Sequence, residues 1–177
     1  MCIRDRFNGK ELWANQFDPK KKKGFGVRAL LDRKDPSFVS GGVSTGDGLI
    51  FLGTTKGEIV ALNVADGTES WRTQVGTEIG ASPAVGDDEV FVHTIDDRLS
   101  ALDVNDGRVI WTADNQMPLL TLRGTASPTY AQGVVFSGTA GGKIAALRGE
   151  NGEPIWEQRL VLPCLLYTSP SPRDATT

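Results

Sequence analysis

The stretch ALDVNDGRVIW, Ala101–Trp111, decides the fold, because two close copies of it stand elsewhere in the chain. ALNVADGTESW precedes it at Ala61–Trp71, and ALRGENGEPIW follows it at Ala146–Trp156. In each copy an Ala-Leu run leads to an Asp-Gly or Asn-Gly pair, and a second run ends on the tryptophan. Such a pair between two β-rich runs favours a type I′ turn, in which both central residues have positive φ. The stretch therefore predicts a β-hairpin.

The similarity continues upstream of these hairpins and defines a longer repeat. Three units align without a gap, at Gly41–Trp71, Ala81–Trp111 and Ala126–Trp156. A partial copy, Asn8-Gly9 followed by Trp13, indicates the end of a further unit within residues 7–17. Each complete unit holds a weak first strand, a β-rich run with a central phenylalanine, and the two strands of the hairpin. The repeat predicts four antiparallel strands per unit.

The spacing of the units indicates a β-propeller. Trp71 and Trp111 lie 40 residues apart, and Trp111 and Trp156 lie 45 apart. Four strands within about 40–45 residues is the size of one propeller blade. Middle runs such as IVAL (Ile59–Leu62) place apolar residues on both faces, as expected for a sheet between two others. We predict an all-β partial propeller of about three and a half four-stranded antiparallel blades. A β-sandwich or a β-solenoid is the alternative.

The composition is that of a globular protein. The chain has 177 residues, of which 39% are hydrophobic, and a formal net charge of −3. No apolar run approaches the roughly 20 residues that a membrane helix needs. The slight negative charge argues against nucleic acid as the main partner.

The two ends of the chain share an unusual relation. The DNA sequence ATG TGT ATA AGA GAC AG can encode Met1–Asp5, and its opposite strand can encode Cys164–Thr168. The shared DNA resembles the transposon-end adapter used to prepare sequencing libraries. We therefore interpret residues 1–6 and 164–177 as adapter-derived, with the second tail expected to be disordered. Residues 7–163 are then a propeller fragment cut at both ends.

The residues favour neither catalysis nor metal binding. Cys2 and Cys164 both lie in the tails, which removes the candidates for a disulfide, a zinc site or a thiol nucleophile. His93, the only histidine, has no counterpart in the other units and is expected at a strand or loop edge. Asp87–Asp88 and Asp96–Asp97 fall where hairpin turns are expected and lack the spacing of a calcium loop. We expect no metal and no cofactor.

A basic run, Lys20–Lys23, stands in the long stretch between Trp13 and Gly41. The main interpretation is a solvated loop between blades, and an interaction with an anionic surface is the alternative. The sequence assigns this run no role.

One connection between units carries apolar residues. The connection after Trp111 is five residues longer than the one after Trp71, and it contains MPLLTLRG at Met117–Gly124. Contiguous exposed apolar surface in a loop usually marks an interaction site. Leucines beside an arginine suit a protein partner. The alternative is that these leucines pack under the propeller rim as a satellite core.

The hairpin pattern resembles the repeat of the quinoprotein-like propellers. The resemblance implies that one tryptophan per unit packs on the neighbouring blade, a role that falls to Trp13, Trp71, Trp111 and Trp156. Quinone-cofactor dehydrogenases share this repeat and use carboxylates, calcium and often adjacent cysteines. The chain between its tails has no cysteine and no clear acidic constellation. A propeller dehydrogenase is therefore an alternative to the main expectation.

A closer resemblance is to the BamB family, propeller lipoproteins of the machine that assembles bacterial outer-membrane β-barrels. It covers nearly all of Phe7–Leu160. It is carried by ALLDRKDPSFVSGGVS, ALNVADGTESWRTQV, HTIDDRLSALDVNDGRVIWT and above all MPLLTLRGTASPT, Met117–Thr129. The resemblance implies an eight-bladed, non-enzymatic scaffold in the periplasm of a Gram-negative bacterium, at the inner face of the outer membrane.

The resemblance also implies a partner. In the family, the segment that matches MPLLTLRG contacts the periplasmic POTRA region of the barrel subunit BamA through two leucines and an arginine. These correspond to Leu120, Leu122 and Arg123. Acidic residues of a following loop, expected beyond Leu160, complete the family's contact. Unfolded outer-membrane proteins are a further candidate partner, and contact with the membrane would need a lipid anchor that we expect to be missing here. A periplasmic propeller with another protein partner is the remaining alternative.

Overall fold

The computed structural model describes residues 2–4, 8–14, 39–114, 126–139 and 141–160, which form strands and turns. The strands are β1 (Cys2–Arg4), β2 (Glu11–Ala14), β3 (Val39–Gly46), β4 (Leu49–Thr54), β5 (Glu58–Asn63), β6 (Glu69–Gln74), β7 (Ala84–Val85), β8 (Glu89–His93), β9 (Arg98–Asp103), β10 (Val109–Asp114), β11 (Thr129–Ala131), β12 (Val134–Gly138), β13 (Lys143–Arg148) and β14 (Pro154–Arg159). Within these described ranges, no helix is long and apolar enough to span a membrane.

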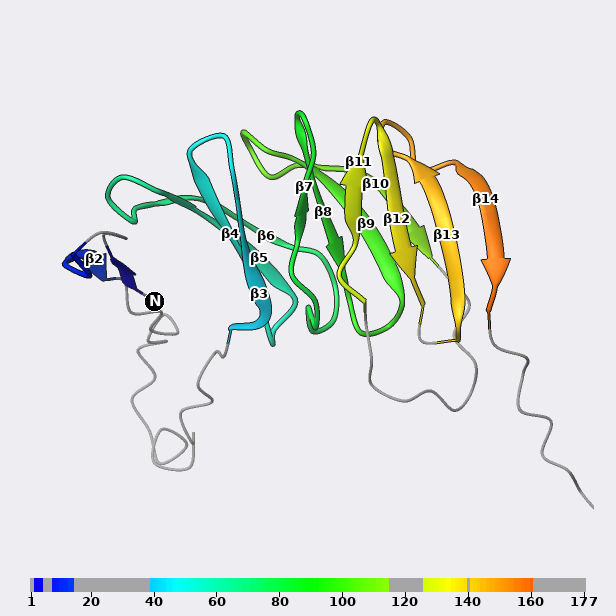
Figure 1. The fold of residues 1–177 in the computed structure, drawn as a ribbon, viewed down its shortest axis with the longest axis horizontal. Helices are drawn as coiled ribbons and strands as arrows, with labels where there is room; N and C mark the ends of the chain where they lie inside the picture. Colours follow the sequence, from blue (N-terminus) through cyan, green and yellow to red (C-terminus); the bar gives the residue numbers. More distant parts are fainter. Residues whose placement is uncertain (1, 5–7, 15–38, 115–125, 140, 161–177) are drawn as a thin grey trace, which may run out of the picture.

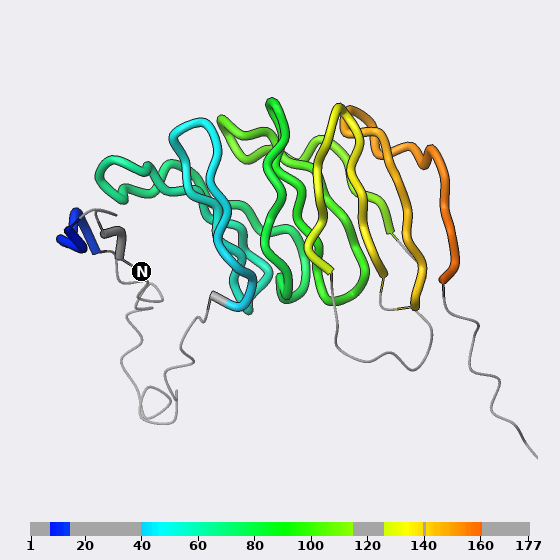
Figure 2. Tube along the Cα trace, in the orientation of Figure 1, coloured from blue at the N-terminus to red at the C-terminus, as the bar shows by residue number. Residues whose placement is uncertain are grey.

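The strands form three four-stranded antiparallel sheets and one two-stranded pair. The first sheet is β3–β6, the second β7–β10 and the third β11–β14, each ordered as in the sequence, and β1 pairs with β2. The first strands of neighbouring sheets contact one another, β3 with β7 and β7 with β11. Figure 1 shows the sheets side by side, and Figure 2 shows the chain passing through them in order. The prediction of an all-β partial propeller with four strands per blade is confirmed.

The core lies between the sheets. Phe51, Ile59 and Ala61 of the first sheet pack on Val90, Val92 and Leu102 of the second. The other face of the second sheet packs on the third, through a cluster of small and medium apolar side chains with one phenylalanine: Ala84, Phe91, Leu99, Ala101, Val135, Ala145 and Leu147. The central residues of β4, β5, β8 and β9 are all buried. Since alternate residues of a strand point to opposite faces, both faces of these two sheets are covered. The apolar middle strands read from the sequence therefore mark sheets covered on both faces.

The hairpins that carry the tryptophans differ from the predicted type I′ turns. Only the glycines Gly67, Gly107 and Gly152 have positive φ, close to 70° in each case, while the preceding Asp or Asn does not. The turn is longer than two residues, as in the first unit, where Gly67 N–H donates to Asn63 C=O and Asn63 N–H donates to Thr68 C=O. The side chain of the Asp or Asn accepts a hydrogen bond from the backbone amide two residues later. This residue therefore stabilises the turn through its side chain and not through a positive φ.

Type I′ geometry occurs elsewhere in the units. Asp47 and Gly48, which join β3 to β4, have φ of 50° and 74°, and Gln132 and Gly133, which join β11 to β12, have φ of 51° and 78°. The short first hairpins of the first and third sheets therefore use the turn that the sequence pattern suggested for the tryptophan hairpins.

Each glycine turn receives a tryptophan from the preceding unit. The Trp71 ring lies so close to Gly107 that a Cβ there would stand under 3.0 Å from the ring, and Trp71 Nε1–H donates to Val104 C=O at 2.7 Å. The same arrangement joins Trp13 to Gly67 and Val64, and Trp111 to Gly152 and Gly149. We call this arrangement the tryptophan–turn contact. A positive φ and a missing side chain are both required of the glycine.

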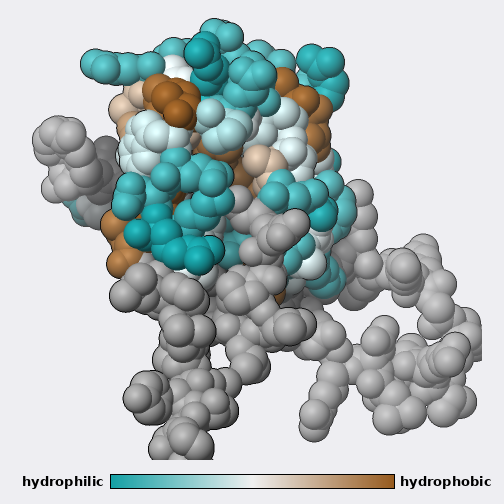
Figure 3. Space-filling view, turned by 90° about the vertical axis from the view of Figure 1, so that its right-hand side faces the viewer, coloured by the Kyte–Doolittle hydropathy of each residue, from teal (hydrophilic) through white to brown (hydrophobic). Residues whose placement is uncertain are grey.

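The series ends at the third sheet. The ring centroids of Trp156 and Phe136 lie 6.2 Å apart, and this pair repeats the pairs Phe51–Trp71 and Phe91–Trp111. Yet Trp156 is 47% exposed, whereas Trp71 is 9% exposed. Figure 3 views the molecule from this side and shows apolar surface among polar surface. The outer face of the third sheet is therefore built like the covered faces of the other two.

Two interpretations of the chain's organisation stay predictions. Of the residues assigned to adapter-derived tails, the structure describes only Cys2–Arg4, which form β1 opposite β2. Residues 164–177 and the basic run Lys20–Lys23 lie outside the described residues. The division of the chain into a propeller fragment, 7–163, and two tails likewise stays a prediction.

Replacing Gly107 by alanine tests the tryptophan–turn contact. Gly48 is the matched control, since its φ is 74° against 70° for Gly107, and nothing stands within 4 Å of a Cβ built there. Both substitutions carry about 1–2 kcal/mol of left-handed strain. We expect Gly107→Ala to lose roughly 1–3 kcal/mol more, because the methyl group overlaps the Trp71 ring. Denaturant unfolding measures the difference, and equal losses for the two variants would contradict the contact.

Candidate functional site

The predicted partner-binding residues belong to the connection between β10 and β11. Leu120, Leu122 and Arg123 lie in residues 115–125, outside the described residues, as does the alternative packing of these leucines under the rim. The structure describes both ends of this segment, Asp114 and Ala126. We call the edge of the propeller that carries these ends the insertion rim, the lower edge in Figure 1.

The start of the segment is held by an exposed ion pair. Arg98, the first residue of β9, places Nε 2.6 Å from Oδ1 of Asp114, the last residue of β10. The two side chains are 39% and 68% exposed. Exposed pairs of this kind contribute little to stability because water and salt screen them.

The end of the segment is held by a buried histidine. His93, the last residue of β8, has no exposed surface, and its Nδ1 lies 3.1 Å from Ala126 C=O. Its Nε2 lies 3.4 Å from Oδ1 of Asp97, which is also buried, without a well-formed hydrogen bond. The expected position at the end of a strand is confirmed, but neither the burial of His93 nor its two contacts could be inferred from the sequence.

The equivalent junction between the first and second sheets is built differently. Gly53 stands at the position of His93, and a Cβ on Gly53 would overlap the side chain of Ile79. Ile79 is fully buried and pairs as a β-bridge with Thr94, so the chain returns close to the sheet. At the first junction, Gly53 leaves space that Ile79 fills. At the longer connection, His93 stands at the position equivalent to Gly53.

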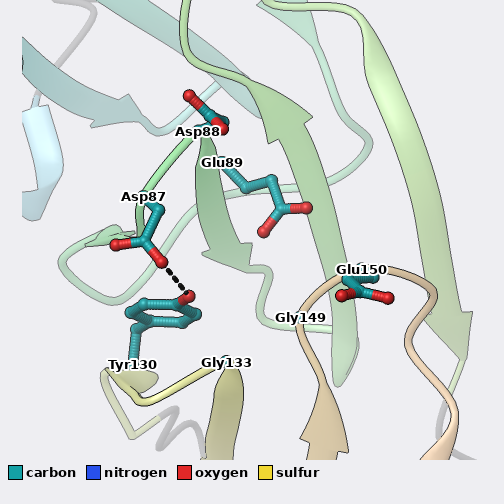
Figure 4. A pocket seen from close by; sticks show the side chains of 7 residues that line it. All are labelled: Asp87, Asp88, Glu89, Tyr130, Gly133, Gly149 and Glu150. Carbon is teal, nitrogen blue, oxygen red and sulfur yellow. Dashed lines mark hydrogen bonds between the residues drawn. The ribbon is translucent and has the colours of Figure 1, made fainter.

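The opposite rim carries an acidic pocket between the second and third sheets. Its volume is about 230 Å³, and it is lined by residues of three turns and of the adjoining strands β8 and β11: Asp87, Asp88, Glu89, Tyr130, Gly133, Gly149 and Glu150. Figure 4 shows these side chains around the opening and the hydrogen bond from Tyr130 Oη to Asp87 Oδ2, 2.9 Å long. Asp87–Asp88 lie in a turn, as predicted, but the sequence could not show that other acidic residues join them.

The charges in this pocket act on one another. Burial raises the pKa of Glu89, and the neighbouring carboxylates of Asp88, Glu150, Asp87 and Asp103 raise it further. The hydrogen bond to Asp87 raises the pKa of Tyr130. Within the described ranges, no group of three or more His, Cys, Asp or Glu is arranged to hold a metal ion.

The chain is similar to known proteins along nearly all of its length. A family model described as outer membrane protein assembly factor BamB matches residues 3–163. The outer membrane protein assembly factor BamB of Xanthomonas campestris is 46% identical over 159 residues, which are 90% of this chain and 37% of the relative. The chain belongs to the BamB family. It spans about two fifths of the length of this relative.

One solved structure agrees with this family membership, and a second shares the fold. The crystal structure of BamB from Moraxella catarrhalis matches with a TM-score of 0.68 and 29% identity, covering 73% of this chain and 40% of that one. A europium-containing methanol dehydrogenase also matches, with a TM-score of 0.57 and 19% identity, over 68% of this chain and 32% of that one. At that identity the likeness shows the fold alone, whereas the named BamB relative is an assembly factor.

Replacing Glu89 by glutamine tests the electrostatics of the acidic pocket. The pKa of Glu89 is raised above its ordinary value of 4.5, so ionised Glu89 destabilises the folded state. We expect Glu89→Gln to raise the melting temperature at pH 7. The gain should shrink as the pH falls and vanish below 4.5, where Glu89 is protonated in both the folded and the unfolded states.

The matched control is Glu153→Gln, an exposed glutamate in a hairpin of the third sheet. Thermal unfolding followed by circular dichroism between pH 4 and pH 8 measures both variants. A gain for Glu89→Gln that does not change with pH would contradict the electrostatic explanation.

Proposed function

We propose that the protein containing this chain is a non-enzymatic scaffold in outer-membrane protein assembly. The supporting observation is the family match over residues 3–163, together with the identity of its relatives as outer membrane protein assembly factors. The chain contributes three complete propeller blades to this scaffold. The scaffold acts in the periplasm, at the inner face of the outer membrane of a Gram-negative bacterium, where a lipid anchor on the full-length protein would hold it.

We further propose that the scaffold binds the POTRA region of a BamA-type barrel subunit through Leu120, Leu122 and Arg123. Two observations support this choice of segment. MPLLTLRG carries the resemblance to the family above all other stretches, and it lies in the connection that is five residues longer than its counterpart after Trp71. The chain on either side of the segment is tied to the second sheet, by Arg98 at Asp114 and by His93 at Ala126.

In this proposal the leucines supply apolar contact area and the arginine supplies charged hydrogen-bond donors. A segment held at both ends loses less conformational entropy on binding than a free one, so more of the contact energy appears as affinity. Unfolded outer-membrane proteins are a second proposed partner of the complete propeller.

The test is the double variant Leu120→Ala with Arg123→Ala in the full-length protein. We expect its affinity for the purified POTRA region to fall by about tenfold or more, because two anchor side chains are lost. Its unfolding transition should not change. Isothermal titration calorimetry and thermal unfolding measure the two quantities.

The matched control is Val109→Ala with Arg108→Ala, an exposed apolar residue and an exposed arginine in the β9–β10 hairpin of the opposite rim. We expect this control to bind normally. Unchanged affinity of the Leu120/Arg123 variant would refute the proposed contact, and a loss of stability in that variant would favour packing of these leucines under the rim.

A further inference from the structure

Two buried polar side chains lie between the second and third sheets, near the insertion rim. His93, the last residue of β8, has no exposed surface, and Ser137, the last but one residue of β12, is 2% exposed. Among the residues that the structure describes, neither His93 Nε2 nor Ser137 Oγ has a hydrogen-bond partner. A buried polar atom without a partner is costly, and nearly all such atoms bond to protein or to an ordered water. Two of them in one interface call for a ligand.

The strand register shows that the two side chains face the same interface. His93 pairs with Leu99 of β9, and Ser137 pairs with Ala145 of β13. Residues directly opposite each other in an antiparallel pair project from the same face of the sheet. Leu99 and Ala145 both belong to the buried cluster that joins the second sheet to the third. His93 therefore faces the third sheet, and Ser137 faces the second.

The equivalent interface between the first and second sheets is apolar. Gly53 stands at the position equivalent to His93, and Ile79 fills the space beside it. Val92 stands at the position equivalent to Ser137. Ile79 and Val92 belong to one buried apolar cluster. The junction of the second and third sheets thus has a polar pair where the first junction has an apolar contact.

Asp97 adds a buried carboxylate to this place. Its side chain is 2% exposed, and its Oδ1 lies 3.4 Å from His93 Nε2. Its φ is 59°, whereas the aligned residues of the other units, at φ of 75° and 73°, are the glycines Gly57 and Gly142. A residue with a Cβ is less favourable than glycine in this left-handed region. The second unit therefore holds a strained backbone where it places a carboxylate beside the imidazole.

The hydrogen-bonding groups at this place define the ligand. His93 Nδ1 lies 3.1 Å from Ala126 C=O, and because a carbonyl oxygen only accepts, Nδ1 carries a proton and donates it. In the neutral ring Nε2 is then an acceptor, and it faces a second acceptor, the Asp97 carboxylate. A ligand that bonds both must supply two donors, and it can accept one hydrogen bond from the Ser137 hydroxyl.

We propose that a buried water molecule binds between the second and third sheets at His93, Asp97 and Ser137. The water donates one hydrogen bond to His93 Nε2 and one to the Asp97 carboxylate, and it accepts one from Ser137 O–H. Three hydrogen bonds to buried polar groups are typical of an internal water. This site joins the two sheets through polar groups, beside the apolar cluster that they share. It is independent of the proposed function of the protein.

A high-resolution crystal structure of the full-length protein tests the site directly. We expect one ordered water within hydrogen-bond distance of His93 Nε2, the Asp97 carboxylate and Ser137 Oγ. A direct hydrogen bond between Ser137 and either of the other two residues, with no water between them, would overturn the inference. So would side chains in the present positions with no density between them.

Ser137→Ala tests the same site in solution. Ser100→Ala is the matched control, because Ser100 is 1% exposed and its Oγ lies 3.2 Å from a partner, Thr112 Oγ1. We expect each substitution in the full-length protein to lower the melting temperature by about 1–4 °C, since each removes a hydrogen-bond partner from a buried group. Thermal unfolding followed by circular dichroism measures both. An unchanged or raised melting temperature for Ser137→Ala would contradict the site, because removal of a hydroxyl that bonds nothing loses no hydrogen bond.

Discussion

The tryptophan at the end of each of the first two complete sheets lies on a glycine turn of the next sheet and donates its indole N–H to a carbonyl beside that turn. One residue thus supplies a large apolar ring and one directed hydrogen bond to the same neighbour. The turn must have a glycine, because the ring occupies the place of a Cβ and the backbone φ is near 70°. We propose that this contact sets the distance and angle between blades.

The two rims of the propeller differ because of where the connections run. Hairpin turns of the second and third sheets meet on one rim, where burial and then the neighbouring acidic residues raise the pKa of Glu89. The longer connection begins and ends on the other rim, where His93 and Arg98 tie its ends to the second sheet. Because the sheets are fixed to one another through their cores, the ends of this connection have defined positions. The proposed partner-binding segment therefore starts from a rigid base.

The repeat pattern was sufficient to predict the strands, their antiparallel order and the sheets covered on both faces. It was misleading for the tryptophan hairpins, since an Asp-Gly pair has more than one turn geometry available, and in the structure these hairpins have the longer one. The acidic pocket could not be predicted, because it combines turns such as Asp87–Glu89 and Gly149–Glu150 that only the packing of two sheets brings together. The sequence marked His93 as unique, and only the structure relates it to Ala126.

Hydrogen–deuterium exchange of the full-length protein, with and without the POTRA region of its barrel subunit, tests most directly whether the insertion rim is the binding surface. The account predicts slower exchange in the complex at residues 115–129 and at the β8–β9 turn, Thr94–Asp97, with no change at Asp87–Glu89 or Gly149–Glu150. Slower exchange at the acidic rim, with none at the insertion rim, would contradict it.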